Sequence, residues 1–165
     1  MRINKDFKAF TKNGGAGKKI ATIFLNPNFH SVCLFRLSNL FYRIHLGVIG
    51  KIIWYINRMI FHVDIDYRAD LAGGFVLVHG LGTVIGRYVV SEGPITVYQH
   101  VTIGGGNGRR GRIDENGKEW PMPLFKGNNK IYAGAFVIGG IVIGERTIIK
   151  AGHTVSKDVP SDSKI

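Results

Sequence analysis

Histidine is the residue type here best suited to moving a proton, because an unperturbed imidazole titrates near neutral pH. An imidazole can act as general base on a hydroxyl, which is a poor nucleophile until it loses its proton. A carboxylate on the far ring nitrogen fixes the tautomer and stabilises the imidazolium. Among the 6 histidines of the chain, His79 follows Asp64 by fifteen residues, and this pair is a candidate for such chemistry. The others apart from His100 are expected to be structural or solvated: His30, His45, His62 and His153.

Other kinds of site find little support in the sequence. No cluster of His, Cys, Asp and Glu has the spacing of metal ligands, so no metal is expected. The single cysteine, Cys33, excludes an internal disulfide and fits a reducing compartment. No secretory signal opens the chain, and a cytoplasmic location is predicted.

The chain is basic, with 22 Lys and Arg against 11 Asp and Glu and a formal net charge of +11. Such a surface attracts phosphates, acidic polymers or an anionic membrane face. The basic residues are scattered and form no recognised nucleic-acid-binding motif, so a nucleic acid is not the expected partner.

A six-residue repeat organises the chain from Val63 onward. A helix repeats every 3.6 residues and a strand every 2, so neither explains a period of six. Repeats of six are typical of a parallel β-helix, in which each hexad supplies one short strand and one turn. The fold class predicted is therefore mainly β, a β-helix, with a valine- and isoleucine-rich sandwich as the alternative. The repeat positions expected to point inward are Ile65, Leu71, Leu77, Thr83, Val89, Ile95, Val101, Ile131, Val137, Ile143, Ile149 and Val155.

Residues 1–61 are predicted to form a basic arm followed by helices. The first 19 residues are polar, and the glycine-rich stretch 13–17 indicates a mobile arm. Helical periodicity then covers 29–46 and 52–61, with Gly47 and Gly50 between. Lys51, Asn57 and Arg58 interrupt the apolar window 44–61, which excludes a membrane span.

These helices have two expected placements. Ten basic residues against Asp6 alone, with aromatic residues interleaved, would suit the inner face of an anionic membrane. Packing on the end of the β-helix and on each other is the favoured placement, because a solenoid needs a cap at its end.

The β-helix domain is predicted over 62–157, with a long loop at 107–129 and a polar tail at 158–165. The loop interrupts the hexads and is rich in basic residues and glycine. Loops of that length in a compact domain are usually functional.

Four short motifs in this region resemble the serine acetyltransferase branch of the left-handed β-helix acyltransferases. They are V-D-I-D-Y at 63–67, V-H-G-L-G at 78–82, V-I-G at 84–86 and Q-H-V-T-I-G-G at 99–105. The family has V-D-I-H-P, D-H-A-T-G, V-x-G and Q-S-V-T-L-G-G at these places. The resemblance covers some three quarters of the chain and implies a left-handed β-helix that transfers acetyl from acetyl-CoA to a hydroxyl.

The resemblance also implies roles for individual residues. His79 matches the general base and Asp64 the carboxylate that orients it. Gly104, Gly105 and Ala133 match positions that line the coenzyme A channel. Lys150 and Lys157 are expected to attract its phosphates. Because the family site lies between neighbouring subunits, a homotrimer is expected.

Three departures from the family pattern bear on the acceptor. Val78 stands where the family has a carboxylate thought to bind the amino group of serine, and His100 replaces a serine. Trp120 and its neighbours occupy the place of a second active-site histidine. Trp120 suits stacking on a sugar, so the predicted acceptor is a carbohydrate hydroxyl of a surface-polysaccharide precursor, contacted by Trp120 and His100. Serine O-acetylation and a non-catalytic anion-binding module remain the alternatives.

Overall fold

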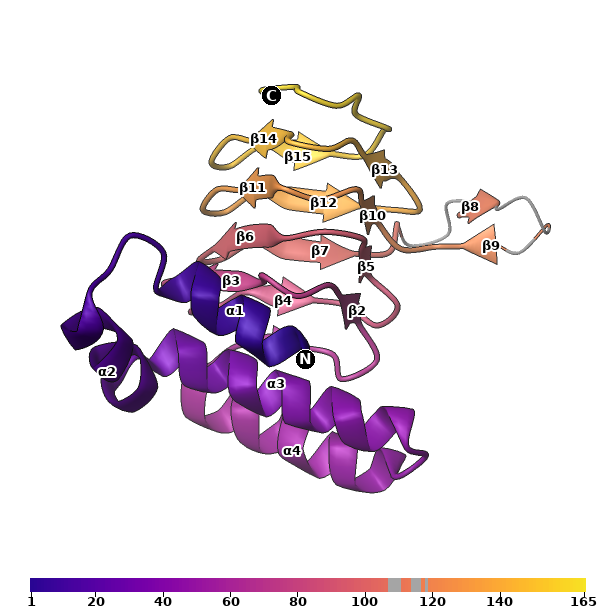
Figure 1. The fold of residues 1–165 in the computed structure, drawn as a ribbon. Coiled ribbons are helices and arrows are strands. Elements are labelled where there is room, and N and C mark those ends of the chain that lie inside the picture. Colours follow the sequence, from indigo (N-terminus) through magenta and orange to yellow (C-terminus); the bar gives the residue numbers. More distant parts are fainter. Residues whose placement is uncertain (107–110, 114–116, 118) are drawn as a thin grey trace.

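The computed structural model describes residues 1–106, 111–113, 117 and 119–165. Its main body is a left-handed parallel β-helix, which confirms the predicted fold class (Figure 1). One sheet contains β1 (Asp64–Ile65), β4 (Val84–Ile85), β7 (Thr102–Gly104), β12 (Phe136–Ile138) and β15 (Thr154–Val155). A second contains β2 (Asp70–Leu71), β5 (Val90–Ser91), β10 (Leu124–Phe125) and β13 (Val142–Ile143). The third contains β3 (Val76–Val78), β6 (Ile95–Tyr98), β11 (Asn129–Ile131) and β14 (Ile148–Ile149).

All twelve residues predicted to point inward are buried. They do not form one uninterrupted register, however. Ile85 pairs with Ile103, eighteen residues later, whereas Ile65 pairs with Ile85 across twenty residues. The first coil is therefore two residues longer than the ordinary coil, and the extra residues fall between Leu77 and Thr83. The six-residue period of the sequence nevertheless shows no break there. Thr83 lies six residues after Leu77 and is buried, although the strand residue that continues the register is Ile85, two residues later.

The loop between β7 and β10 is shorter than predicted. Residues 107–110, 114–116 and 118 of the predicted loop lie outside the described residues. The described remainder contains an antiparallel pair, β8 (Arg112–Ile113) and β9 (Glu119–Trp120). The chain has rejoined the solenoid by β10, and Phe125 is fully buried there. The prediction that the loop extends to 129 was wrong because Phe125 occupies a hexad position with an aromatic ring instead of an aliphatic side chain.

Four helices precede the β-helix: α1 (Arg2–Phe10), α2 (Ala16–Leu25), α3 (Pro27–Arg43) and α4 (Gly47–Phe61). The predicted mobile arm is thus wrong, because α1 and the start of α2 lie within it. Figure 1 shows α3 and α4 crossing the first-coil end of the stack, with α1 beside them. Val32 and Phe35 of α3 join the core of the coils, so the helices cap this end of the solenoid.

Gly50 has a packing role within α4 and does not break it. A Cβ on Gly50 would come 2.8 Å from the carbonyl oxygen of Ser38 on α3. Glycine therefore permits α3 and α4 to approach closely, and α4 begins at Gly47 where the sequence pattern predicted 52. No helix in the described part of the chain is long and apolar enough to cross a membrane.

The segment 158–165, predicted as a polar tail, packs along the last coil. Val159 forms a parallel bridge with Ile143, and Lys164 forms one with Ile148. The Arg146 guanidinium donates to the Asp162 carboxylate at 2.6 Å and lowers the pKa of that carboxyl. These contacts cover the end of the stack opposite the helices (Figure 1).

Candidate active site

His79 lies in the lengthened corner of the first coil, directly after β3. Its backbone is left-handed, with φ of 53°, and its side chain is exposed. The next residue, Gly80, donates its N–H to Asn28 Oδ1 of α3 at 2.8 Å. The hydrogen bond from Gly80 thus joins the lengthened corner to the helical cap, and the His79 side chain is exposed at this corner.

A cleft of about 400 Å³ opens at this corner, between the end of α4 and the first coil. It is lined by Pro27, Asn28, Ile60, Phe61, His62, His79 and Leu81. An exposed imidazole at such a cleft can reach a proton of a bound hydroxyl compound.

Asp64 lies on β1 and lines an adjoining cleft of about 330 Å³. Its carboxylate accepts a hydrogen bond from Trp54 Nε1 at 2.9 Å and pairs with Arg58 at 3.2 Å. In the described part of the chain the carboxylate therefore bonds to α4 and not to His79. The predicted orientation of His79 by Asp64 stays a prediction.

His62 lines both clefts, although the sequence indicated a structural or solvated residue. It ends α4 in the left-handed conformation, with φ of 53°, and its carbonyl accepts from the Gly82 N–H at 2.9 Å. Its position in the sequence, one residue before the V-D-I motif that contains Asp64, could have indicated that it lies near the site.

His100 occupies the same corner one coil further on, where its backbone N–H donates to the backbone carbonyl of Leu81 at 2.9 Å. The imidazole lies against Gly82, and a Cβ at Gly82 would overlap the ring. Gly82 also has a φ of 68°, a left-handed backbone that favours glycine, so the close approach of the ring and the backbone conformation both suit glycine there. The structure thus brings His100 to the edge that carries His79.

Cys33 is the remaining nucleophilic side chain of interest, and it lines a different hollow, between α1 and α3. Burial, with a further contribution from the nearby Asp6 charge, raises the pKa of its thiol. The nucleophilic thiolate is therefore disfavoured at Cys33. Among the described residues no group of three or more His, Cys, Asp and Glu could hold a metal ion.

Comparison with known proteins identifies the family. A serine acetyltransferase of Bacillus pumilus is 32% identical over 156 residues, which cover 94% of this chain and 68% of that protein. The chain belongs to the serine acetyltransferase family. A second serine acetyltransferase, from Synechococcus elongatus, is 31% identical over 161 residues, 97% of this chain and 63% of that protein. No family model matches the chain.

Solved serine acetyltransferase structures share the fold. The enzyme from Brucella abortus superposes with a TM-score of 0.85 at 26% identity, over 99% of this chain and 63% of that one. A structure of the Brucella abortus enzyme in complex with coenzyme A gives a TM-score of 0.84 at 25% identity, over 98% of this chain and 62% of that one. The chain thus spans about two thirds of the length of these relatives.

The residues predicted to bind coenzyme A, three from the family resemblance and two lysines from their charge, fall at two edges of the five-stranded sheet. Ala133 and Lys150 precede β12 and β15 at the corner that carries His79 and His100, and the Gly152 N–H donates to the Ala133 carbonyl at 2.8 Å. Gly104, Gly105 and Lys157 lie at the opposite edge, where β7 and β15 end. Within this chain the structure does not bring the five residues together.

Trp120 belongs to this opposite edge too. It lies on β9, half-buried, with the Arg112 guanidinium 5.8 Å from the centre of its ring. Its carbonyl packs against Gly140, where an added Cβ would overlap it, and the following residues contact Gly105. The two residues predicted to contact the acceptor, Trp120 and His100, therefore lie on different edges of the sheet in this chain.

Proposed function

We propose that this member of the serine acetyltransferase family is an acetyl-CoA-dependent O-acetyltransferase in which His79 is the general base. The observation that carries the proposal is the lengthened corner, which presents an exposed His79 at a cleft beside the end of α4. His79 takes the proton of the acceptor hydroxyl while the oxygen attacks the thioester carbonyl carbon. The C–S bond then breaks, and His79 returns the proton to the departing thiolate.

Acetyl-CoA is the proposed co-substrate. Gly104 has open space around the position of a Cβ, which permits a ligand to approach the backbone. Lys150 and Lys157 are exposed and can attract phosphates. A coenzyme A complex of the Brucella abortus relative supports this choice.

Serine is the acceptor that the comparisons favour. The relatives named above are serine acetyltransferases, and none of them supports the predicted surface-polysaccharide sugar. One observation keeps a sugar hydroxyl as a second candidate. Val78, at the end of β3, provides no carboxylate beside His79 to bind the ammonium group of serine.

The acceptor is tested by measuring thiol release from acetyl-CoA with L-serine, with nucleotide sugars and with oligosaccharides. We expect serine to raise thiol release above the rate of acetyl-CoA hydrolysis alone. A response to a sugar and none to serine would instead indicate a sugar hydroxyl as the acceptor. Failure of acetyl-CoA to bind at low salt in calorimetry would contradict the enzyme and favour an anion-binding module.

The site proposal also implies a trimer. The His79 edge and the edge with Gly105 and Trp120 bound the same sheet, so a threefold assembly can set one edge of a subunit against the other edge of its neighbour. We expect light scattering at micromolar concentration to give three times the 18.2 kDa of the chain. A monomer at that concentration would contradict a shared site.

A further inference from the structure

Helix α4 exposes most of its apolar residues. The two fully buried residues are Gly50 and Asn57, which face α3. A stripe with helical spacing points outward, and Val48 is 77% exposed. The stripe consists of Val48, Ile52, Tyr55 and Met59. A surface helix normally turns its apolar stripe to the core, so this arrangement predicts an apolar environment outside α4.

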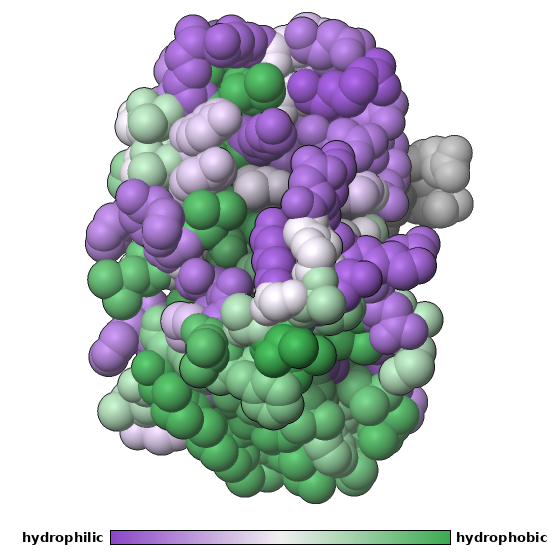
Figure 2. Space-filling model, turned by 60° about the vertical axis from the view of Figure 1, so that its left-hand side comes forward, coloured by the Kyte–Doolittle hydropathy of each residue, from purple (hydrophilic) through white to green (hydrophobic). Residues whose placement is uncertain are grey.

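Helix α2 has the same arrangement. Its one buried residue is Thr22, while Phe24 and Leu25 are 71% and 78% exposed. Figure 2 shows apolar residues gathered over the helical end of the molecule, whereas the coils are mostly hydrophilic. We call Phe24, Leu25, Val48, Ile52, Tyr55 and Met59 the helical end face. Extended apolar surfaces of this kind mark binding to another protein or to a membrane.

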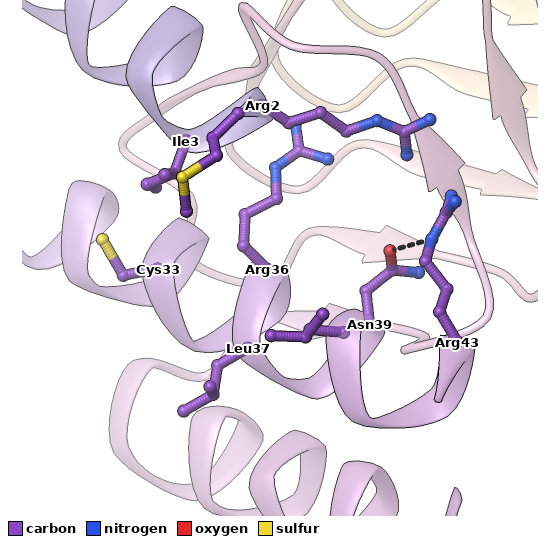
Figure 3. Close-up of a pocket in the computed structure, with 9 residues that line it drawn as sticks. Arg2, Ile3, Cys33, Arg36, Leu37, Asn39 and Arg43 are labelled. Carbon is purple, nitrogen blue, oxygen red and sulfur yellow. Dashed lines mark hydrogen bonds between the residues drawn. The ribbon is translucent and has the colours of Figure 1, made fainter. Parts of the chain in front are cut away.

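A hollow of about 370 Å³ lies between the start of α1 and α3 (Figure 3). Leu37 and Leu40 line it and are 43% and 52% exposed. The guanidinium group of Arg43 stands at its end and bonds to Asn39. Apolar side chains bordered by basic groups thus recur on the third helix.

The charges around the helical end face indicate what kind of partner it binds. Residues 16–61 contain six Lys and Arg and no Asp or Glu. Arg36, Arg43 and Arg58 pair with carboxylates of α1 and the coils, which leaves the charges of Lys18, Lys19 and Lys51 for a partner. Lys19 and Lys51 are exposed, and Lys51 precedes Tyr55 by one turn of α4. Two copies of the chain joined through this face would place like charges together with no carboxylate of α2–α4 to pair them. A partner with both apolar and anionic groups fits the face, and an anionic lipid bilayer has both.

We propose that the helical end face binds the surface of an anionic lipid bilayer, with α2 and α4 lying in the interfacial region. The apolar side chains enter the acyl boundary while Lys19 and Lys51 contact the lipid headgroups. Because Ile60 and Phe61 line the cleft of His79, binding places this cleft beside the membrane surface.

Flotation of the full chain with lipid vesicles tests the proposal. We expect binding to vesicles of phosphatidylcholine with phosphatidylglycerol, much weaker binding to phosphatidylcholine alone, and loss of binding as salt rises. The double variant Val48→Ser/Ile52→Ser should lower partitioning about tenfold or more. Lys51→Gln should lower it about fivefold.

The matched controls are Ile113→Ser, an exposed apolar residue of β8, and Lys164→Gln at the far end of the stack. Both should bind vesicles as the unchanged chain does, and circular dichroism should show every variant folded. Absence of vesicle binding would overturn the proposal, as would equal losses in the controls. The unchanged chain could fail to bind vesicles while Val48→Ser/Ile52→Ser has a lower molar mass than the unchanged chain. That result would show that the face joins copies of this chain instead.

Discussion

Replacing His79 with alanine should lower turnover by about 10²–10⁴-fold, the usual contribution of a positioned general base. The loss should appear in thiol release with the active acceptor, because His79 interacts with the acceptor proton as it moves. Molar mass and acetyl-CoA affinity should be unchanged, since the coenzyme contacts proposed above involve other residues. Light scattering and calorimetry on the variant check these two quantities.

His100→Ala is the matched control for the proton transfer, because His100 lies at the same corner one coil further on and the proposed transfer uses only His79. Near-normal turnover in His79→Ala, together with loss of turnover in His100→Ala, would contradict His79 as the base. It would place the catalytic centre at His100, one coil nearer the long loop. Asp64→Asn should cost less than His79→Ala if Asp64 only orients the ring. A thermal melt of Asp64→Asn is needed beside it, because the carboxylate also holds Trp54 and Arg58.

The fold could be predicted because a period of six has a direct geometric meaning, and every residue of the aliphatic series is buried. The same regularity concealed the two-residue insertion at His79. Thr83 fits the series and is buried, so the sequence pattern continued across a corner that the strand register shows to be longer. The family resemblance therefore indicated His79 as a candidate base, whereas only the structure shows that its side chain is exposed at a cleft.

The partners of the site residues could not be predicted because they depend on how α4 packs against β1. Nothing in the spacing of Trp54, Arg58 and Asp64 shows that all three meet. The placement of His62 between two clefts depends on the same packing. Likewise, the basic N-terminal segment resembled a mobile arm because the residues that fix α1 lie far away in the sequence.

Asp6 is the residue of α1 that bonds to these distant residues, and its side chain is fully buried. It accepts two hydrogen bonds from Arg36 at 2.8 and 3.0 Å and two more from the N–H groups of Gly74 and Phe75 at 2.7 and 2.9 Å. Arg36 in turn donates to the carbonyl of Leu71 at 2.6 Å. One carboxylate thus joins α1, α3 and the turn before β3.

Asp6→Ala should therefore lower the free energy of unfolding by about 3–5 kcal/mol, because it leaves a buried guanidinium without its counter-charge. Asp70→Ala is the matched control. Asp70 also pairs with arginines of α1 and α3, Arg2 and Arg43, but its side chain is 47% exposed. Exposed pairs contribute about 0–1 kcal/mol, so this variant should unfold close to the unchanged chain.

Urea unfolding at one fixed protein concentration compares the variants, since assembly makes apparent stability depend on concentration. Losses within about 1 kcal/mol of each other for Asp6→Ala and Asp70→Ala would contradict the assignment. The double variant Asp6→Ala/Arg36→Met separates charge from hydrogen bonding. It should recover part of the loss because the uncompensated charge is gone. The rest should remain, because the N–H groups of Gly74 and Phe75 still lack the carboxylate that accepts from them.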